Sequence, residues 1–591
     1  MQVLVVDGYT DEPAALGVPP YIAPLPRYIA GAALDAGASF AGYVTIDQLR
    51  GWAGRREDGA VRRERREARS AARAGRARRG PPPGGDRSGP LPGRLMPPRG
   101  RWDIVVLVAG AVVPGNYLRA RPASGRELAE VASNAEATTI LAGAAARWGW
   151  TSGAPATEDM RRAFDHVATA DGDALVHDLV AGDRAPRHRL RTAAEWARWP
   201  VLGAIVVVRH PDFPRPLVAE VETYRGCVRH AFGGCSFCTT VRDAPPRFRT
   251  PRAVAKEVAA LAAAGVVAFR LGGQSCIYSY RAQGVGEQEA PTPDPSAVRE
   301  LLEGVRAVAP GLEVLHVDNA NPAVIAGHPR EAEEVTRLLV RHCTSGNVVA
   351  LGLESADPEV KEANRLNATP EQALDAIRLI NRVGGARGPT GLPWLLPGIN
   401  LLAGLHGETE ATYDLNMAFL RRVLDEGLLV RRTNIRQVAP VCAEFDVRRH
   451  HAEFRAFKQR ARLEFDRPML ERVVPYGTVL RGVWTEVHDG GTTFGRQPGS
   501  YPLLVGIPAK LGLGSAIDVA VVSWGPRSVT AVPYPLDLDA APMSVLAAVP
   551  GIGRRRAARI VLGRPVRDLA HLRSLLDEPV AADSLAPLLR P

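Results

Sequence analysis

Residues 225–238 read Arg-Gly-Cys-Val-Arg-His-Ala-Phe-Gly-Gly-Cys-Ser-Phe-Cys, and this stretch places three of the six cysteines of the chain within twelve residues. The glycines between the cysteines allow a short loop to turn its thiols toward one centre. Cysteine thiolates bind zinc ions and iron-sulfur clusters. The stretch therefore predicts a metal-binding loop.

Two kinds of metal centre are compatible with this loop. With His230, the cysteines form C-x2-H-x4-C-x2-C, which supplies four ligands to a structural zinc ion that carries out no chemistry. Without it, Cys227, Cys235 and Cys238 leave one iron of a [4Fe-4S] cluster without a protein ligand and open to a small molecule. The loop alone leaves both alternatives open.

Length and composition predict a chain of several domains with no membrane span. The 591 residues exceed a single core and indicate about three or four domains, and a hydrophobic content of 46% is ample for burial. No apolar run approaches the roughly eighteen residues of a membrane helix, and residues 1–7 read as a buried strand rather than a secretory signal. The six cysteines do not form a disulfide scaffold, so we expect a cytoplasmic protein.

Positive charge is concentrated in one segment. The formal net charge is +11, and residues 53–101 hold fifteen arginines against five acidic residues, so the rest of the chain is nearly neutral. This segment is rich in Arg, Gly, Pro and Ala and has almost nothing to bury, which predicts a disordered surface insertion. Such an insertion is either a passive solvated loop or an electrostatic tether for polyanions.

Strands and helices alternate over residues 1–195 and predict a Rossmann-like, doubly wound α/β domain. Apolar runs of the parallel-sheet type occur at 2–7, 41–46, 102–110 and 138–144, and a helix is expected over 27–36. The basic insertion separates the second and third of these strands.

A regular repeat of strands and helices fills residues 196–470 and predicts a partial (βα)6 barrel of the TIM type. Strands are expected at 217–222, 266–271, 313–317, 348–353, 399–403 and 433–438, and helices at 251–264, 296–308, 330–341, 369–382 and 409–424. The cysteine loop and several glycine-rich segments follow the carboxyl ends of these strands, where barrels of this type place their chemistry.

The cysteine loop and the barrel together resemble the radical SAM superfamily over about residues 200–445. The resemblance implies that Cys227, Cys235 and Cys238 hold a [4Fe-4S] cluster and that Phe237 lies near the adenine of S-adenosylmethionine (SAM). The first gap is C-x7-C rather than the usual C-x3-C, although other members of the superfamily lengthen this gap too.

Later segments extend the resemblance in the expected order. Gly272-Gly273-Gln274 is similar to the Gly-Gly-Glu segment that holds the methionyl amino group, with an amide in place of the customary carboxylate. Glu354 and Ser355, followed by Asn-Arg-Leu-Asn-Ala-Thr at 364–369, resemble a fourth-strand motif that contacts the ribose. Gly-Leu-His-Gly-Glu-Thr at 404–409 resembles the GLPGET turn of the family.

The resemblance implies a mechanism and its partners. A flavodoxin- or ferredoxin-type donor supplies an electron, SAM is cleaved, and the resulting 5′-deoxyadenosyl radical abstracts hydrogen from a substrate carbon. Methylthiolation is disfavoured because the first domain lacks the three cysteines of a second cluster, and cobalamin because D-x-H-x-x-G is absent. Cys276, Cys343 and Cys442 are expected to be buried, inert thiols.

Two small domains are expected at the C-terminus. Short strands over 471–535 with Gly and Pro turns predict a β-barrel of OB type, which resembles the TRAM domain of tRNA-modifying enzymes or merely caps the larger barrel. Residues 540–591 fit two helices joined by Gly551-Ile552-Gly553, which resembles a helix-hairpin-helix motif. The resemblance implies that Gly551, Ile552, Gly553 and Arg554 receive a nucleic-acid phosphate.

These features predict a radical SAM enzyme that modifies a nucleic acid, tRNA or another RNA or DNA. One alternative is radical chemistry on a small molecule or a protein, with the C-terminal domains serving assembly. A minor alternative is a zinc-stabilised nucleic-acid-binding protein without enzymatic activity.

Overall fold

The computed structural model describes residues 1–10, 17–51, 95–98, 100–110, 117–149, 161–243, 245–440, 443–577 and 582–589. Its backbone divides into two compact units, Met1–Pro211 and Asp212–Pro591. The predicted insertion at 53–101 lies almost wholly outside the described residues, and Cys442 lies outside them too. Within the described residues, no helix has the length and apolarity that crossing a bilayer requires.

The first unit is built on a five-stranded sheet in which every strand pairs in parallel with its neighbour. The strands are β1 (Gln2–Asp7), β3 (Phe40–Thr45), β4 (Ile104–Val108), β5 (Thr138–Ala142) and β6 (His166–Val167), in the order β3-β1-β4-β5-β6. Counted along the chain this is the order 2-1-3-4-5 of doubly wound folds. The central strands β1 and β4 are Val- and Leu-rich and buried, as a sheet covered on both faces requires.

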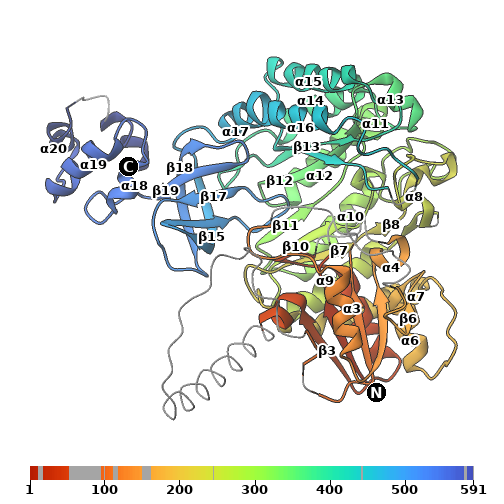
Figure 1. Cartoon of the computed structure of the whole chain (residues 1–591). Helices are drawn as coiled ribbons and strands as arrows, with labels where there is room; N and C mark the ends of the chain where they lie inside the picture. Colours follow the sequence, from red (N-terminus) through yellow and green to blue (C-terminus); the bar gives the residue numbers. More distant parts are fainter. Residues whose placement is uncertain are drawn as a thin grey trace, which may run out of the picture. The chain divides into compact units, whose positions relative to one another are not determined.

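Helices flank this sheet, and the short strand β2 (Tyr21–Ile22) precedes the first of them (Figure 1). They are α1 (Pro24–Asp35), α3 (Gly125–Ser133), α4 (Ala144–Trp148), α6 (Gly172–Val180) and α7 (Ala193–Leu202), and α7 continues into the 3-10 segment Gly203–Arg209. Helices α3 and α7 each begin with a capping box, formed by Ser124 with Glu127 and by Thr192 with Glu195.

The second unit contributes three parallel strands to each of the two sheets that form the predicted partial barrel. One has β7 (Val218–Glu222), β10 (Ala268–Gly272) and β11 (Val314–Val317), and the other has β12 (Asn347–Glu354), β13 (Leu395–Ala403) and β14 (Arg432–Gln437). In the part of the chain that the structure describes, one parallel bridge, between Ala320 and Leu351, joins the two sheets. In the described chain β14 pairs only with β13, so it is an edge of the barrel.

The barrel helices begin with a recurrent pair of residues, a polar cap followed by proline. The caps Thr250, Asp294, Asn321, Asp357 and Thr369 each accept a hydrogen bond from a backbone N–H in the first turn. Proline at the first helical position has no N–H that would remain unpaired there. The pattern fixes where the chain leaves each loop at the barrel mouth and enters a helix.

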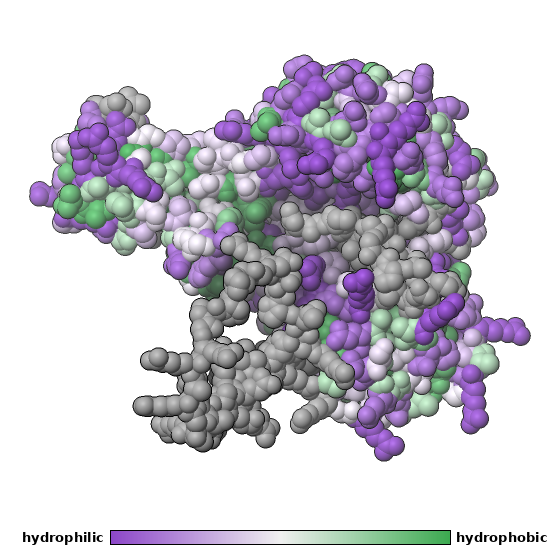
Figure 2. All heavy atoms as spheres, viewed as in Figure 1, coloured by the Kyte–Doolittle hydropathy of each residue, from purple (hydrophilic) through white to green (hydrophobic). Residues whose placement is uncertain are grey.

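These helices surround the strands (Figure 1), and the surface over α14, α15 and α16 is mostly hydrophilic (Figure 2). They are α9 (Pro251–Ala263), α10 (Pro295–Val308), α11 (Pro322–Gly327), α12 (Pro329–His342), α13 (Pro358–Ala363), α14 (Pro370–Gly384) and α15 (Glu410–Asp425). After β14 follow α16 (His451–Ala461), a π-helical turn η4 (Arg462–Asp466) and α17 (Arg467–Val473).

A closed five-stranded barrel occupies the region where a small β-barrel was predicted. Its strands are β15 (Val479–Asp489), β16 (Thr492–Arg496), β17 (Leu504–Ile507), β18 (Ala516–Trp524) and β19 (Ser528–Pro533), in the order β15-β16-β17-β19-β18. The C-terminal helices are α18 (Met543–Ala547), α19 (Gly553–Leu562) and α20 (Leu569–Leu575). Val522 and Val532 of the barrel share one apolar core with Leu546 and Ile560 of the helices, so the helices pack on the barrel.

The small barrel also contributes a loop, residues 497–503 between β16 and β17, to the interior of the partial barrel. The Tyr501 hydroxyl donates to Asp318 Oδ2 at 3.0 Å, and the Ser500 N–H donates to His316 Nδ1 at 2.8 Å. The Tyr501 ring packs on Val348 and Ala350. The two barrels of the second unit are therefore joined through buried side chains.

Candidate active site

The predicted site residues meet at the carboxyl ends of the barrel strands. The cysteine loop follows β7 and the two-residue strand β8 (Tyr224–Arg225), and Gly272–Gln274 follow β10. Glu354 ends β12, and the turn at 404–409 follows β13. Because parallel strands end at the same edge of a barrel, these segments form one mouth.

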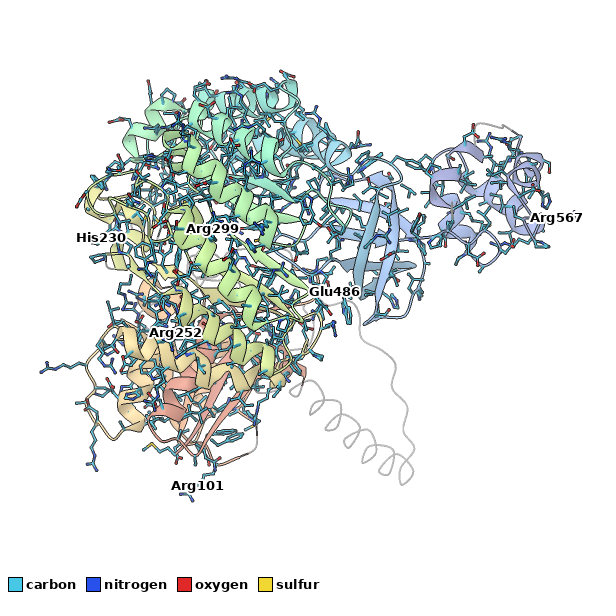
Figure 3. The ribbon with its side chains drawn as sticks, turned by 180° about the vertical axis from the view of Figure 1, so that it is seen from behind. Arg101, His230, Arg252, Arg299, Glu486 and Arg567 are labelled. Atoms are coloured by element: carbon cyan, nitrogen blue, oxygen red, sulfur yellow. The ribbon has the colours of Figure 1, made fainter. Side chains whose placement is uncertain are left out.

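The cysteine loop folds on itself through a 3-10 segment, η2 (Val228–Phe232), that occupies the long first gap. Gly233 and Gly234 follow with φ of 79° and 56°, a left-handed conformation that suits glycine. His230 uses Nδ1 for a 2.8 Å hydrogen bond to the Val241 carbonyl, and Figure 3 shows its label at the outer margin of this part of the ribbon. The His230 side chain thus closes the loop by its hydrogen bond to the backbone of Val241.

The three thiols of the loop are free cysteines within electrostatic reach of one another. Burial raises the pKa of Cys227 to about 11 and that of Cys235 to about 12. A buried thiol with a raised pKa is stabilised as a thiolate only by a positive centre, which an iron-sulfur cluster provides.

The two metal centres need different sets of ligands. In the described part of the chain, no three His, Cys, Asp or Glu side chains are placed to hold a single metal ion. Four zinc ligands must all approach one ion to about 2.3 Å or less, whereas each cysteine of a [4Fe-4S] cluster binds a different iron and the thiols stay further apart. The chemistry of the donors fits the cluster: three cysteine thiols, one of them accepting from Arg229, are the set that a [4Fe-4S] cluster with one open iron takes, and His230 uses its Nδ1 for the Val241 carbonyl.

Arg229 is a site residue that sequence reasoning missed. Its Nη1 donates to Cys235 Sγ at 3.0 Å, its Nη2 donates to the Arg365 carbonyl at 2.9 Å, and its Nε donates to Glu289 at 2.9 Å. The guanidinium is buried next to Cys235, a predicted cluster ligand. Its place inside the cysteine loop was the only signal that could have identified it.

Gln274 is buried, and its amide is occupied by the protein itself. Oε1 accepts from Thr223 Oγ1 at 3.1 Å, and Nε2 donates to the carbonyls of Leu271 at 3.0 Å and Asp318 at 2.7 Å. The side chain therefore braces the loop after β10, and it could bind an ammonium group only by giving up these bonds. That Gly272–Gln274 hold the methionyl amino group of SAM remains a prediction.

Gly272 and Gly273 lie where a larger residue would not fit. A Cβ at Gly272 would collide with the Glu220 carboxylate, and one at Gly273, whose φ is 72°, would meet Glu222. The glycines keep these buried carboxylates close to the mouth of the barrel. The loop needs its glycines for packing whether or not it binds a cofactor.

Glu354 lies near the cysteine loop, and Phe237 is part of that loop. The Glu354 carboxylate lies close enough to Cys235 to raise its pKa further, and Glu354 has a φ of 66° at an irregular end of β12. Phe237 packs with Leu405 and Phe445 in an apolar cluster that includes Cys235. Ser355 is buried, and its hydroxyl accepts from the Asp357 N–H at 3.2 Å, so it caps a turn.

Asn364 fastens the cysteine loop to the turn after β13. Its Oδ1 accepts from Ser236 Oγ at 2.9 Å and from the His406 N–H at 3.2 Å, and its Nδ2 donates to the carbonyls of His406 and Val360 at 2.8 Å each. The sequence motif at 364–369 contained this residue but gave no indication of this role. Three segments at the mouth are held in register by one buried amide.

The turn at 404–409 is held by Glu408 and borders a small cavity. The Glu408 carboxylate accepts from the Gly404 and Leu405 N–H groups at 2.9 and 3.0 Å and from the Tyr413 hydroxyl at 2.8 Å. The adjoining cavity of about 100 Å³ is lined by this turn and by Gln437, His450 and Phe454. It is too small for a cofactor the size of SAM, because ligand pockets are roughly 300–1,000 Å³.

The predicted phosphate-binding residues lie apart from this mouth, in the C-terminal helices. Gly551, Ile552, Gly553 and Arg554 form the turn between α18 and the start of α19. Ile552 is buried, whereas Gly551, Gly553 and Arg554 are exposed.

Known proteins resemble the chain over most of its length. The model of the radical SAM superfamily matches residues 221–414. The uncharacterized protein MJ0274 of Methanocaldococcus jannaschii is 41% identical over 546 residues, which cover 90% of this chain and 92% of that protein.

Two other known proteins match a smaller part of the chain or have a lower sequence identity to it. The tRNA-2-methylthio-N(6)-dimethylallyladenosine synthase of Sorangium cellulosum is 28% identical over 217 residues, 36% of this chain and 40% of the synthase. The radical S-adenosylmethionine methyltransferase TsrM from Kitasatospora setae is 16% identical with a TM-score of 0.43, covering 73% of this chain and 72% of TsrM.

The matched residues 221–414 contain all three clustered cysteines and the strands whose ends surround them. The minor alternative of a zinc-stabilised protein without enzymatic activity is therefore set aside. The chain belongs to the radical SAM superfamily and is an enzyme that uses a [4Fe-4S] cluster and S-adenosylmethionine.

Proposed function

We propose that this radical SAM enzyme modifies a nucleic acid, with tRNA as the first candidate. The observation that carries the proposal is the turn at 551–553. Gly551 and Gly553 have φ of 82° and 59°, and buried Ile552 anchors the turn between them. The turn presents the first N–H groups of α19 to solvent, where a phosphate can accept hydrogen bonds from them.

The charges around the turn suit an anion. Helix α19 has no side-chain cap at its N-terminus and no acidic residue in its first turn. Arg554 and Arg555 are exposed beside it, and residues 540–591 hold eight arginines against four acidic residues. Backbone N–H groups and arginines bind phosphates without reading the base sequence, so this contact would position a nucleic acid rather than select it.

Two further features support RNA. The Sorangium cellulosum relative is named for a tRNA product. The sequence pattern over 471–535 resembles the TRAM domain attached to tRNA-modifying enzymes, and this region forms a closed five-stranded barrel. Methylthiolation itself is not proposed, because the three N-terminal cysteines that a second cluster needs are missing from residues 1–195.

Each residue at the mouth has a defined task in this proposal. Cys227, Cys235 and Cys238 hold the cluster, Arg229 donates to one of its sulfur ligands, and Phe237 supplies an apolar wall. The bound cluster and SAM supply one-electron cleavage of a C–S bond and abstraction of a hydrogen atom from substrate carbon. The other residues at the mouth orient the reactants and exclude water.

The test measures tRNA binding and SAM cleavage by the anaerobically purified full chain. We expect salt-dependent binding, and faster formation of 5′-deoxyadenosine with tRNA than without it. Replacing Gly551 and Gly553 by alanine should weaken binding about tenfold, the effect of losing about 1.4 kcal/mol of hydrogen bonding. The matched control is Gly490→Ala, another glycine with positive φ, 56°, and open space around it.

Two outcomes would contradict the proposal. One is the absence of tRNA, RNA and DNA binding at low salt. The other is binding that leaves 5′-deoxyadenosine formation unchanged. Either would favour a small-molecule or protein substrate, with the C-terminal domains serving assembly.

A further inference from the structure

Phe232 is an exposed aromatic side chain on the cysteine loop. Of the phenylalanines, tyrosines and tryptophans that the structure describes, it alone is exposed, at 39%, and the others are buried or half-buried. It lies at the end of η2, three residues before Cys235. Aromatic side chains are enriched at protein–protein interfaces, where a few of them supply most of the binding energy. A ring exposed at this one place therefore indicates a surface that another molecule covers.

The cysteine loop places its two aromatic rings in different surroundings. Phe237, two residues after Cys235, packs with Leu405 and Phe445 in the apolar cluster at the mouth. Phe232 instead remains in solvent. SAM and the substrate are expected beside Phe237 and the strand ends. The surface that carries Phe232 is therefore available to a different partner.

A second segment holds an arginine beside the exposed ring. Arg365 follows α13 and has a φ of 51°, a left-handed conformation that is uncommon for residues other than glycine. A Cβ at Gly233, next to Phe232, would lie 2.9 Å from Arg365 Nη1, so the guanidinium lies against the backbone of the loop. Within the described residues, the Arg365 guanidinium has no carboxylate partner. Its charge is therefore available at the surface.

Hydrogen bonds make this arrangement rigid. The Ser236 N–H donates to the Asn364 carbonyl at 3.0 Å, and Ser236 Oγ donates to Asn364 Oδ1 at 2.9 Å. The Arg365 carbonyl accepts from Arg229 Nη2 at 2.9 Å. Arg365 is thus fastened to the loop at its own carbonyl and through the residue before it. A preformed surface loses little conformational entropy when a partner binds.

Arg242 adds a second exposed positive charge next to the loop. It lies in α8 (Thr240–Asp243), which packs on η2. The Val241 carbonyl accepts from His230 Nδ1 at 2.8 Å, and the Val241 side chain lies where a Cβ of Gly234 would be. The fold therefore keeps the segment that carries Arg242 close to the segment that carries Phe232.

The chemistry of the site indicates what kind of partner docks here. Reductive cleavage of SAM takes one electron from outside the enzyme, and electron transfer slows steeply with distance, so a carrier has to dock near the cysteines. Only two residues separate Phe232 from Cys235. Glu289 is paired with Arg229, which leaves the charges of Arg242 and Arg365 to attract an acidic protein. Redox partners bind through small, transient interfaces, and one ring flanked by two cations suits such an interface.

We propose that Phe232, Arg242 and Arg365, the carrier patch, form the docking site of an acidic one-electron carrier protein of the flavodoxin or ferredoxin type. One electron passes from the reduced carrier to the oxidised cluster, the carrier is oxidised by one electron, and no bond forms or breaks in this step. Phe232 makes the central apolar contact, and the two arginines steer and orient the carrier. The inference does not depend on the substrate, because the electron is needed whatever the radical attacks.

The experiment uses the anaerobically purified full chain with its cluster, and reduced flavodoxin and reduced ferredoxin as probes. The variants are Phe232→Ala and a double variant with Arg242→Gln and Arg365→Gln. The matched controls are Leu415→Ala on α15 and Arg299→Gln on α10, because both side chains are exposed on helices of the barrel. The affinity for each carrier and the initial rate of cluster reduction are measured at low and physiological salt. Reduction by dithionite and binding of single-stranded RNA are measured in the same variants.

Phe232→Ala should weaken carrier binding and slow reduction by the carrier about tenfold, an effect typical of a central interface residue. The double arginine variant should be slower than the unmodified chain at low salt and approach its rate at high salt, because salt screens the attraction. In Phe232→Ala, the iron content and the rate of reduction by dithionite, which needs no docking site, should stay unchanged. Both controls should match the unmodified chain.

Three results would overturn the inference. The first is that neither carrier binds or reduces the unmodified chain at low salt. The second is that Phe232→Ala leaves affinity and rate unchanged, or slows reduction by dithionite to the same extent, which would give the ring a role in packing the loop. The third is that the variants bind RNA more weakly and the carriers equally well, which would assign the carrier patch to nucleic acid. The first two results would leave the proposed function standing, and a failure of tRNA binding would leave the carrier patch standing.

Discussion

Arg229 is the charged side chain that most directly affects the cluster site. It occupies the long gap between the first two cysteines and places a guanidinium 3.0 Å from Cys235 Sγ. Hydrogen bonds to the sulfurs and net charge are two determinants of the reduction potential of an iron-sulfur cluster. The lengthened gap, C-x7-C, gives the loop room for Arg229, and we expect its positive charge to favour the reduced form of a cluster bound there.

Replacing Arg229 by Gln should lower the midpoint potential of the cluster. The reduced cluster carries one more negative charge, so loss of the nearby cation disfavours reduction. A charge-assisted hydrogen bond of about 1.5 kcal/mol corresponds to roughly 60 mV for a one-electron couple. The potential is read by EPR during a redox titration, with Arg242→Gln, an exposed arginine of the same region, as control. An unchanged potential would show that Arg229 only holds the loop.

The sequence indicated which residues lie at the site, but it did not indicate which hydrogen bonds their side chains form. Three cysteines at C-x7-C-x2-C are a local signal, and in the structure Cys235 lies within electrostatic reach of Cys227 and Cys238, whereas their role as cluster ligands stays a prediction. Gln274 was chosen for the chemistry of its side chain, yet its amide is used by Thr223 and Asp318. Hydrogen bonds between residues about 50 positions apart leave no periodic trace in a sequence.

Loops that follow different strands meet at the mouth, and Asn364 joins two of them. Its four hydrogen bonds connect the cysteine loop, α13 and the turn after β13. The turn around His406, which bonds Asn364, carries Gly404 and Gly407 with φ of 86° and 82°, a left-handed conformation that suits glycine.

Replacing Asn364 by Ala should loosen the cysteine loop without unfolding the barrel. The buried partners left unpaired would cost about 2–4 kcal/mol of stability. We expect a smaller change in the EPR spectrum of the reduced cluster when SAM is added. Asn381→Ala on α14 is the matched control, because Asn381 also joins two elements through its amide but lies away from the mouth. An equal effect on the spectrum in both variants would contradict this role of Asn364.

The elements themselves were largely predictable. The six barrel strands and the five long helices expected over 217–438 are present, with ends shifted by a few residues. Apolar periodicity marks a strand or helix locally, and a polar cap before proline marks a helix start. The short helices α11 and α13 were not predicted, since six residues contain too few turns to produce a clear period.

At the scale of the second unit, a loop of the small barrel forms part of the interior of the partial barrel. The Tyr501 hydroxyl, in the 497–503 loop, donates a hydrogen bond to Asp318. The Cζ atom of Arg432 lies 4.5 Å from the centroid of the Tyr501 ring. Asp318 also accepts from Gln274 through its carbonyl, so the loop is connected to the strand end at the mouth. The sequence predicted that the small barrel is a cap or an RNA-binding module. Its role as a support inside the partial barrel depends on Tyr501 and Asp318, which are 183 residues apart, so no local pattern could indicate it.

His316 makes this connection sensitive to acid. Burial lowers its pKa from the ordinary 6.5 to about 4, and its Nδ1 accepts from the Ser500 N–H, which requires an unprotonated nitrogen. Because the folded pKa is depressed, the contribution of His316 is complete above pH 6.5 and is lost as the pH falls toward 4. The difference between the two values corresponds to about 3 kcal/mol.

We therefore expect the stability of the second unit to decrease between pH 6.5 and 4 and expect His316→Asn to flatten this decrease. Asn Oδ1 can accept from Ser500 and does not protonate in this range, so the variant keeps the hydrogen bond and loses the titration. Denaturant midpoints at several pH values give the free energy of unfolding, with exposed His451→Asn as control. A His316→Asn variant that keeps the full pH dependence would place the acid-sensitive group elsewhere and leave the loop as a purely apolar support.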